Sequence, residues 1–184
     1  RGALKLKAAL EEFGFNPYGL DVLDVGASSG GFTEILLERG ASRVFAVDVG
    51  YGQLHERLRL NPRVRSLEKQ DVRKLCPSIF SEPLKAITVD VSFISLTKVL
   101  PHLLNLAAST CWLVALIKPQ FEVGRKAIGK GGIVKDPAET EKAIGRIEEL
   151  FHGPDGWLVS GIISSPILGG SGNREFLIGA HRDA

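Results

Sequence analysis

The segment Asp24-Val25-Gly26-Ala27-Ser28-Ser29-Gly30-Gly31-Phe32-Thr33 decides the fold class of this chain. It follows a short apolar run, residues 21–25, and leads into an amphipathic run, residues 32–38. A glycine-rich turn between a strand and a helix is a common ligand site in α/β proteins, because backbone N–H groups and a helix N-terminus meet there. The segment therefore predicts a nucleotide-like ligand at the end of a strand in an open α/β sheet.

The same alternation continues on both sides of this segment. Strand-like runs at 43–47, 64–67, 86–90 and 112–117 alternate with amphipathic runs at 53–60, 98–107 and 138–151. The last two strand-like runs, 157–164 and 174–180, have only a Gly/Ser/Pro-rich connection between them, so we expect them to pair antiparallel at one edge. We predict an α/β, Rossmann-like, mostly parallel seven-stranded sheet with an antiparallel edge strand and helices on both faces, formed as one domain by residues 1–184.

Composition narrows the class of protein. The chain has 184 residues, of which 44% are apolar, enough for one domain with a substantial core. Its apolar runs are far shorter than the roughly 20 residues that a membrane helix needs, and no secretory signal opens it, so we expect no membrane partner. The two cysteines and four histidines have no metal-ligand spacing, so we expect no metal and a cytoplasmic location. The chain begins at Arg1 and contains no Met, and we expect a piece of a longer protein without its N-terminal domain.

The glycine segment argues against two of its three usual ligands. Gly26 and Gly31 have the spacing of a phosphate-binding P-loop, but Phe32 stands where the lysine is required. Ser28 occupies the position of the second glycine in a dinucleotide fingerprint, which leaves a NAD-dependent oxidoreductase as a weak alternative. The D-V-G-x-x-x-G-G-F pattern suits a ligand without phosphates whose amino-acid end lies against glycine backbone. We therefore predict S-adenosylmethionine as the cofactor.

Two carboxylates follow neighbouring strands and complete this cofactor site. Asp48 closes the second strand and is placed to accept hydrogen bonds from both ribose hydroxyls. Asp71 follows the third strand and could accept from the adenine amino group, although it could equally be an ordinary turn residue. The residues expected to bind the cofactor are Asp24, Gly26, Ala27, Ser28, Gly30, Gly31, Phe32, Asp48, Val49, Asp71, Val72 and Asp90.

A lysine and an aspartate are candidates for catalysis. Methyl transfer to a hydroxyl requires aligned reactants and removal of a proton, which a lysine amine can perform when carboxylates orient it. Lys118 ends the apolar run 112–117, where a lysine is costly unless it is paired or functional. Asp90 ends the fourth strand beside the expected crevice, where the alternative role is a helix or turn cap. We expect both at the reacting centre.

The chain resembles the TlyA (hemolysin A) family of FtsJ-like ribose methyltransferases over nearly its whole length. The resemblance is carried by residues 23–32, 47–54, 90–96 (Asp-Val-Ser-Phe-Ile-Ser-Leu), 118–124 (Lys-Pro-Gln-Phe-Glu-Val-Gly) and 169–175 (Gly-Gly-Ser-Gly-Asn-Arg-Glu). It implies 2′-O-methylation of cytidines in ribosomal RNA by a Lys-Asp-Lys-Glu tetrad. By motif, the tetrad falls on Lys5, Asp90, Lys118 and Glu175.

Two members of this tetrad follow from the resemblance alone. By its neighbours, Lys5 would be assigned to the solvated face of an amphipathic segment, and Leu4 stands where the family usually has a histidine. Glu175 could equally be half of a surface ion pair with a neighbouring cation. The expectation that Lys5 and Glu175 belong to the site therefore comes from the family resemblance and not from the chemistry of their sequence neighbours.

A cationic loop is the candidate RNA surface. Residues 124–135 combine four cations with four glycines directly after Lys118, so they could hold RNA phosphates, or simply form a flexible solvated loop. We expect ribosomal RNA or ribosomal subunits as partners, and only weak methylation of ribosomal RNA by residues 1–184 alone. The alternatives are a catalytically silent RNA-binding module and a hemolysin-type membrane-active protein.

Overall fold

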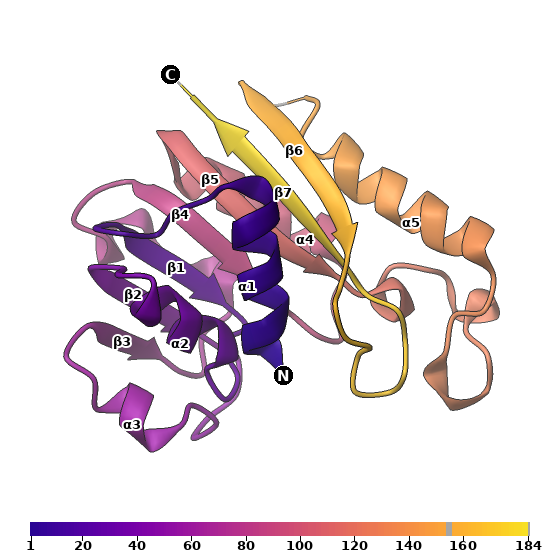
Figure 1. The fold of residues 1–184 in the computed structure, drawn as a ribbon, viewed down its shortest axis with the longest axis horizontal. Helices are drawn as coiled ribbons and strands as arrows, with labels where there is room; N and C mark the ends of the chain where they lie inside the picture. The colour runs from indigo at the N-terminus through magenta and orange to yellow at the C-terminus, as the bar shows by residue number, and fades with distance from the viewer. Residues whose placement is uncertain (154–155, 184) are drawn as a thin grey trace.

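The computed structural model describes residues 1–153 and 156–183, which form one seven-stranded sheet covered by helices (Figure 1). The strand order is β3-β2-β1-β4-β5-β7-β6. The strands are β1 (Asp21–Val25), β2 (Arg43–Val47), β3 (Val64–Leu67), β4 (Leu84–Val89), β5 (Ala107–Ile117), β6 (Trp157–Ser164) and β7 (Phe176–Arg182). The α-helices are α1 (Gly2–Phe13), α2 (Gly31–Glu38), α3 (Glu56–Arg59), α4 (Leu96–Leu106) and α5 (Pro137–Glu149).

The strand directions confirm a mostly parallel sheet and the expected antiparallel pairing of its last two strands at one edge. Strands β1 to β5 pair in parallel, whereas β7 is antiparallel to both β5 and β6. The antiparallel strand β7 is therefore not at the edge, which is formed by β6. The reason is that α5 carries the chain from β5 to a position two places away, and the short connection after β6 returns β7 into the gap.

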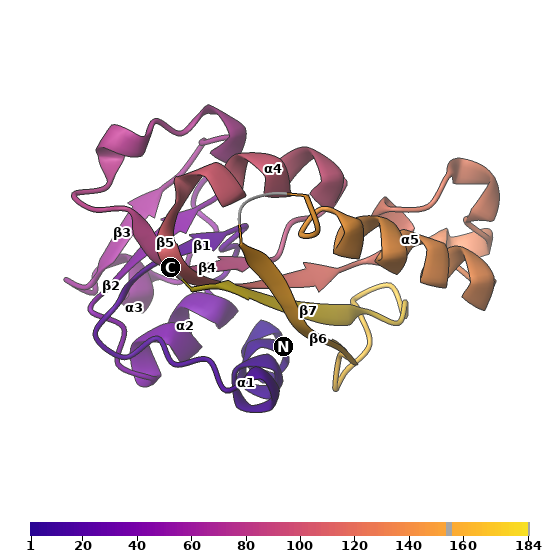
Figure 2. The same cartoon turned by 90° about the horizontal axis from the view of Figure 1, so that it is seen from above.

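Helices cover both faces of the sheet (Figure 2): α1 and α2 lie on one face, and α4 and α5 on the other. Leu23 belongs to the apolar core under α4, whereas the preceding residue, Val22, belongs to the core under α1 and α2. Such alternation is expected of a strand that is buried on both faces. The helix α4 contributes a stripe at helical spacing: Leu96, Val99, Leu100, Leu103 and Leu104.

One expected helix is much shorter than its sequence pattern. The amphipathic run 53–60 forms only the single turn α3, Glu56–Arg59. Its start is set by His55, whose side chain accepts a hydrogen bond from Arg57 N. Its end precedes Asn61, which cannot easily continue a helix because Pro62 follows it. The connection from β2 to β3 is therefore mostly loop, and this loop borders the site.

Candidate functional site

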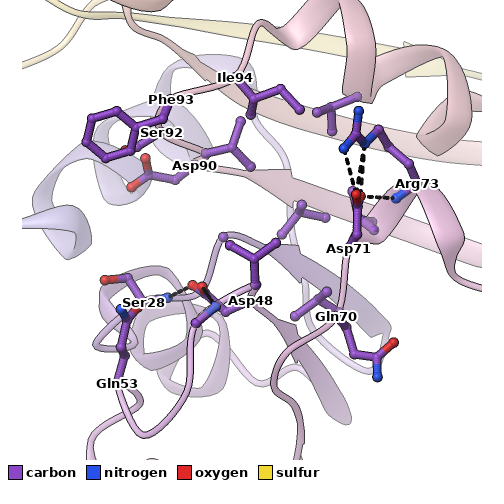
Figure 3. Close-up of a pocket in the computed structure, with 18 residues that line it drawn as sticks. Ser28, Asp48, Gln53, Gln70, Asp71, Arg73, Asp90, Ser92, Phe93 and Ile94 are labelled. Carbon is purple, nitrogen blue, oxygen red and sulfur yellow. Dashed lines mark hydrogen bonds and ion pairs between the residues drawn. The ribbon is translucent and has the colours of Figure 1, made fainter.

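A cavity of about 560 Å³ opens where β1, β2 and β4 end, and we call it the strand-end cavity (Figure 3). Its walls come from the loops that follow these parallel strands and from the turn after β3. Ligand sites of open α/β sheets lie at this edge because the carboxyl ends of the strands converge there. It is lined by seven of the residues expected to bind a cofactor: Gly26, Ser28, Asp48, Val49, Asp71, Val72 and Asp90.

Gly26 brings two of these loops together. It has φ +79°, and a Cβ atom there would lie 2.1 Å from the carbonyl oxygen of Asp90. Only glycine allows both this backbone conformation and this approach. The glycine thus joins the loop after β1 to the loop after β4 and leaves open space in front of them.

Asp48 presents a fixed carboxylate to the cavity. Its Oδ2 accepts a hydrogen bond from Ser28 N at 2.7 Å, and its Oδ1 accepts one from Gly50 N at 2.8 Å (Figure 3). A carboxylate has about four acceptor positions, so each oxygen keeps capacity for a further donor. Asp48 is therefore held in one orientation and can still accept two hydroxyl groups.

Asp71 lies on the cavity wall but its side chain is already occupied. Arg73 donates from Nε to Oδ1 at 3.0 Å and from Nη2 to Oδ2 at 2.6 Å, and Asp71 also caps the following turn through Arg73 N. These hydrogen bonds lower the pKa of the Asp71 carboxyl to about 2. Asp71 is therefore also a turn residue that caps the turn after β3, the other role that its sequence position allowed. Arg73, which the sequence did not single out, lines the same cavity.

Asp24 does not reach the cavity wall, contrary to the expectation of direct contact. It is fully buried and accepts hydrogen bonds from Thr33 Oγ1 at 2.7 Å and from Thr88 Oγ1 at 3.0 Å. Burial raises the pKa of its carboxyl to about 7. Asp24 is the penultimate residue of β1 and its side chain points into the interior, so its hydrogen bonds to Thr33 and Thr88 tie β1 to α2 and β4 below the ligand loop.

Four other expected residues of the glycine segment also point away from the strand-end cavity. Phe32 is buried in the core beneath α1 and α2, and Ala27 borders a small depression beside the cavity. A Cβ atom at Gly30 would lie 2.2 Å from Leu58 Cδ1, and one at Gly31 would lie 3.0 Å from Ala3 N. Gly30 and Gly31 therefore allow Leu58 and the start of α1 to pack closely against the N-terminus of α2. Of the residues in this turn, Gly26 and Ser28 line the strand-end cavity.

The first pair of candidate catalytic residues meets at the ends of β4 and β5. Lys118 Nζ lies 2.7 Å from Asp90 Oδ1 and donates a hydrogen bond to Ser92 Oγ at 2.8 Å. The side chains are 12% and 23% exposed for Lys118 and Asp90. The lysine at the end of the buried strand is thus paired, and it stays open to a ligand. Ser92 lies in the motif of residues 90–96, but no feature of the sequence indicated a role for it in the site.

The second pair joins opposite ends of the chain. Lys5 Nζ, on α1, lies 2.6 Å from Glu175 Oε2, which directly precedes β7. Both residues are buried, so neither the solvated-face assignment of Lys5 nor the surface-pair alternative for Glu175 holds. The cause is the packing of α1 against the sheet through Leu6 and Leu10. A Cβ atom at Gly169 would lie 2.2 Å from Glu175 Oε1, so this glycine makes room for the carboxylate.

A second cavity, of about 460 Å³, adjoins the first, and we call it the glycine-loop cavity. Lys118 and Glu175 line it, together with Gly131, Gly132 and Gly170, and it shares Ser92 and Phe93 with the strand-end cavity. Both ion pairs therefore contribute a residue to this second cavity, and Asp90 contributes to the first.

Phe93 stands at the boundary between the two cavities. It is 89% exposed and has φ +63°, and its ring centroid lies 5.0 Å from that of Phe121. A bulky residue with positive φ is strained, and such strain is often found at functional sites. The sequence contains no signal for this conformation, because the strain arises from the path of the loop between Asp90 and α4.

Glu122 links the two loops that carry the first ion pair. Its Oε1 accepts from Leu96 N at 2.8 Å and its Oε2 accepts from Ser95 Oγ at 2.5 Å, at the N-terminus of α4. Burial raises the pKa of the Glu122 carboxyl. This contact holds the loop after Lys118 against the loop after Asp90, and it was not predicted.

The four cations of the segment 124–135, Arg125, Lys126, Lys130 and Lys135, are all exposed. Within this segment an antiparallel bridge joins Ile128 to Val134. Its glycines at 131 and 132 reach the glycine-loop cavity, so the cationic surface continues directly into the site.

Over residues 1–153 and 156–183, no helix is long and apolar enough to cross a membrane. The same two stretches contain no group of three His, Cys, Asp or Glu residues that could hold a metal ion.

Comparison with known proteins gives consistent results. The family model described as FtsJ-like methyltransferase matches residues 1–182. The chain is 46% identical over 182 residues to the 16S/23S rRNA (cytidine-2'-O)-methyltransferase TlyA of Mycobacterium tuberculosis (strain CDC 1551 / Oshkosh), covering 97% of this chain and 66% of that protein. It is 41% identical over 177 residues to the 23S rRNA (cytidine-2'-O)-methyltransferase TlyA of Campylobacter jejuni, covering 96% and 68%. The chain therefore spans about two thirds of the length of these relatives.

Among solved structures, the chain matches the crystal structure of "a putative hemolysin from Lactococcus lactis" with a TM-score of 0.95 and 40% identity, covering 100% of this chain and 88% of that one. The predicted family and fold class are thereby confirmed.

Proposed function

We propose, from the premise that this chain belongs to the FtsJ-like methyltransferase family, that it transfers a methyl group from S-adenosylmethionine to the ribose 2′-hydroxyl of a cytidine in ribosomal RNA. The substrate named for its TlyA relatives supports this choice. The proposal assigns the activity to one domain, residues 1–184, and to the cytoplasm, where ribosomal RNA and the methyl donor occur together.

The observation that carries the proposal is the convergence of two ion pairs beside two adjoining cavities. Lys118 pairs with Asp90 at 2.7 Å, and Lys5 pairs with Glu175 at 2.6 Å. Four different segments supply these side chains, and core packing does not require charged groups there. A donor cavity lined by Asp90 and an adjoining acceptor cavity lined by Lys118 and Glu175 are what a two-substrate transfer needs.

The strand-end cavity fits the methyl donor. Gly26 leaves backbone exposed where a Cβ would close the gap to Asp90, and Asp48 keeps acceptor capacity for two ribose hydroxyls. Gly26, Ser28, Asp48 and the backbone around Val72 would hold S-adenosylmethionine. When bound, it supplies an electrophilic methyl group on a sulfonium sulfur. Because Arg73 already occupies both Asp71 oxygens, we assign Asp71 a supporting role in shaping this wall.

In this proposal Lys118 removes the proton of the acceptor hydroxyl. The ammonium form that pairs with Asp90 must first release a proton to solvent, and the resulting neutral amine has two N–H groups and one lone pair. Ser92 Oγ accepts one N–H group at 2.8 Å and the Asp90 carboxylate lies 2.7 Å from Nζ, so both hold the amine while its lone pair is left for the proton. Glu175 and Lys5 orient the ribose from the other side of the glycine-loop cavity, which Glu175 lines.

The RNA would lie over the glycine-loop cavity. The exposed cations of the segment 124–135 can contact phosphates, which positions a strand without reading its sequence. The exposed ring of Phe93, between the two cavities, can stack on an unpaired base. Base-specific recognition by these two features alone is limited, so we expect only weak activity of residues 1–184 on their own.

The proposal is tested by incubating the full-length protein with labelled S-adenosylmethionine and ribosomal subunits, and by mapping 2′-O-methyl groups on the RNA. We expect label at one or a few cytidines, and labelling reduced by about 10²–10⁴-fold with the Lys118→Ala variant. Label on a base, on protein or on no RNA at all would contradict the proposal. The silent RNA-binding alternative predicts RNA binding with no transfer.

A further inference from the structure

Asn173 is a buried polar residue that belongs to neither ion pair. It is 2% exposed and lies between the two glycine-rich segments of the chain, 124–132 and 169–172. Burying an amide is costly unless its donors and acceptor are satisfied. The hydrogen-bond partners of the Asn173 amide therefore indicate its structural role.

The local backbone aims Asn173 and Glu175 the same way. Burial alternates over Asn173, Arg174 and Glu175, with Arg174 exposed, as in an extended strand where every second side chain shares a face. Two backbone hydrogen bonds close this turn, Ser165 N to Glu175 O and Gly169 N to Asn173 O, both at 2.8 Å. The segment that presents Glu175 to the site therefore also presents Asn173.

The Asn173 amide joins this turn to the cationic segment. Its Nδ2 donates to Gly132 O at 2.9 Å, and its Oδ1 accepts from Val134 N at 3.0 Å. Nδ2 also donates to Ser171 Oγ at 3.2 Å within its own turn. The planar amide of Asn173 thus donates to the carbonyl of Gly132 and accepts from the N–H of Val134, two residues further along the chain. A carboxylate cannot donate and an ammonium group cannot accept, so neither could make both hydrogen bonds.

The segment that is held in this way has few other restraints. Gly131 and Gly132 have φ values of +76° and +78°, and a Cβ atom at either would meet nothing within 4 Å. Besides Asn173, the segment is closed by contacts within itself: the Ile128–Val134 bridge, Gly129 N donating to Ile133 O at 2.8 Å, and Gly132 N donating to Gly129 O at 3.1 Å. Its conformation over the glycine-loop cavity therefore depends strongly on the two bonds from Asn173.

We propose that Asn173 is a positioning residue for the RNA substrate: it latches the cationic segment 124–135 onto the turn 169–172 and thereby builds the RNA-facing wall of the glycine-loop cavity. The assignment to RNA rests on the proposed function. Asn173 does not line the strand-end cavity, so its loss should weaken RNA binding and leave S-adenosylmethionine binding unchanged.

The latch is tested first without any substrate, by limited trypsin digestion of the full-length protein. Arg125, Lys126, Lys130 and Lys135 are cleavage sites within the latched segment. We compare Asn173→Ala with the isosteric Asn173→Asp, which keeps an acceptor for Val134 N but cannot donate to Gly132 O when ionised. The matched control is Asn105→Ala, which removes the same amide from the exposed surface of α4.

Both Asn173 variants should be cut within 124–135 about tenfold faster than the wild type, as expected when hydrogen bonds worth about 1.4 kcal/mol are lost. Asn105→Ala should match the wild type. Unchanged cleavage in both Asn173 variants overturns the latch. Loss of the native fold in both variants overturns it as well, because Asn173 would then support the whole domain and not one segment.

The role in RNA binding is tested with ribosomal subunits as substrate and by calorimetric titration with S-adenosylmethionine. For Asn173→Ala we expect the KM for subunits to rise about tenfold, kcat to stay within about threefold, and the Kd for S-adenosylmethionine to be unchanged. A fall in kcat with unchanged KM, or an equal loss of both affinities, overturns the role. If the wild type itself transfers no methyl group, the proposed function fails, and the digestion still decides on the latch.

Discussion

Lys5 Nζ lies 2.6 Å from Glu175 Oε2 across 170 residues of sequence, and both side chains are almost completely enclosed. An isolated charge at such a position is strongly destabilising, whereas the pair as a whole contributes little net stability. The pair therefore links the docking of α1 on the sheet to the integrity of the proposed active site.

The first prediction concerns this buried pair. Lys5→Met should lower the free energy of unfolding by about 3–5 kcal/mol, because it leaves the Glu175 carboxylate buried without its partner. The double variant Lys5→Met/Glu175→Gln should recover much of this loss and still lack methyl transfer. Urea unfolding measures both values, with Lys7→Met on the exposed side of α1 as the control. Equal stability of Lys5→Met and the wild type would show that the pair is not formed in solution.

The second prediction concerns the proposed base. Lys118→Ala should bind S-adenosylmethionine as the wild type does and should reduce transfer by about 10²–10⁴-fold, the usual contribution of general base catalysis. Ser92→Ala should cause a smaller loss, because Asp90 still holds the amine. Calorimetry and single-turnover assays separate binding from transfer, and Lys98→Ala on exposed α4 surface is the control. Transfer at the wild-type rate by Lys118→Ala would remove Lys118 from the role of base.

The third prediction concerns the approach of two backbone segments. Gly26→Ala should abolish S-adenosylmethionine binding, because the new Cβ would collide with Asp90 O at 2.1 Å and push the loop after β4 out of place. Gly52→Ala is a matched control: its φ of +67° is similarly unfavourable, but nothing lies within 4 Å of the new Cβ. If both variants lose the same affinity, backbone strain and not the collision is responsible.

The fourth prediction is a pH dependence of stability that arises from Asp24. Burial raises its pKa from 3.8 to about 7, so between these values the folded state holds a proton that the unfolded state has released. This contribution to stability is therefore present at low pH and is lost as pH rises from about 4 to about 7, by up to about 1.4 kcal/mol per pH unit.

Asp24→Asn should remove this slope, since the amide cannot titrate. Urea unfolding of both proteins from pH 4.5 to 8 should show the variant gaining stability relative to the wild type as pH rises. A constant difference across that range would mean that Asp24 does not titrate there. The comparison with the wild type cancels the contribution of other groups, including Glu122, whose pKa burial also raises.

The sequence by itself determined the fold class and the place of the site. Strand-like and helical runs alternate with recognisable periods, and parallel strands necessarily bring their carboxyl ends to one edge. Asp48, Asp90 and Lys118 each follow a strand, so their convergence could be predicted from order along the chain. Phe32 and Ser28 also excluded a P-loop and weakened a dinucleotide site through local chemistry alone.

Only the tertiary structure decided which members of these motifs face the ligand. Gly26 and Asp24 are two residues apart in one motif, yet Gly26 lines the cavity and Asp24 is sealed beneath it by Thr33 and Thr88. The insertion of β7 between β5 and β6, the enclosure of Lys5 with Glu175 and the latch at Asn173 likewise join distant segments. Local patterns specify strands, helices and turns because those depend on neighbouring residues, whereas the direction of a side chain and its burial depend on what packs against it from elsewhere in the chain.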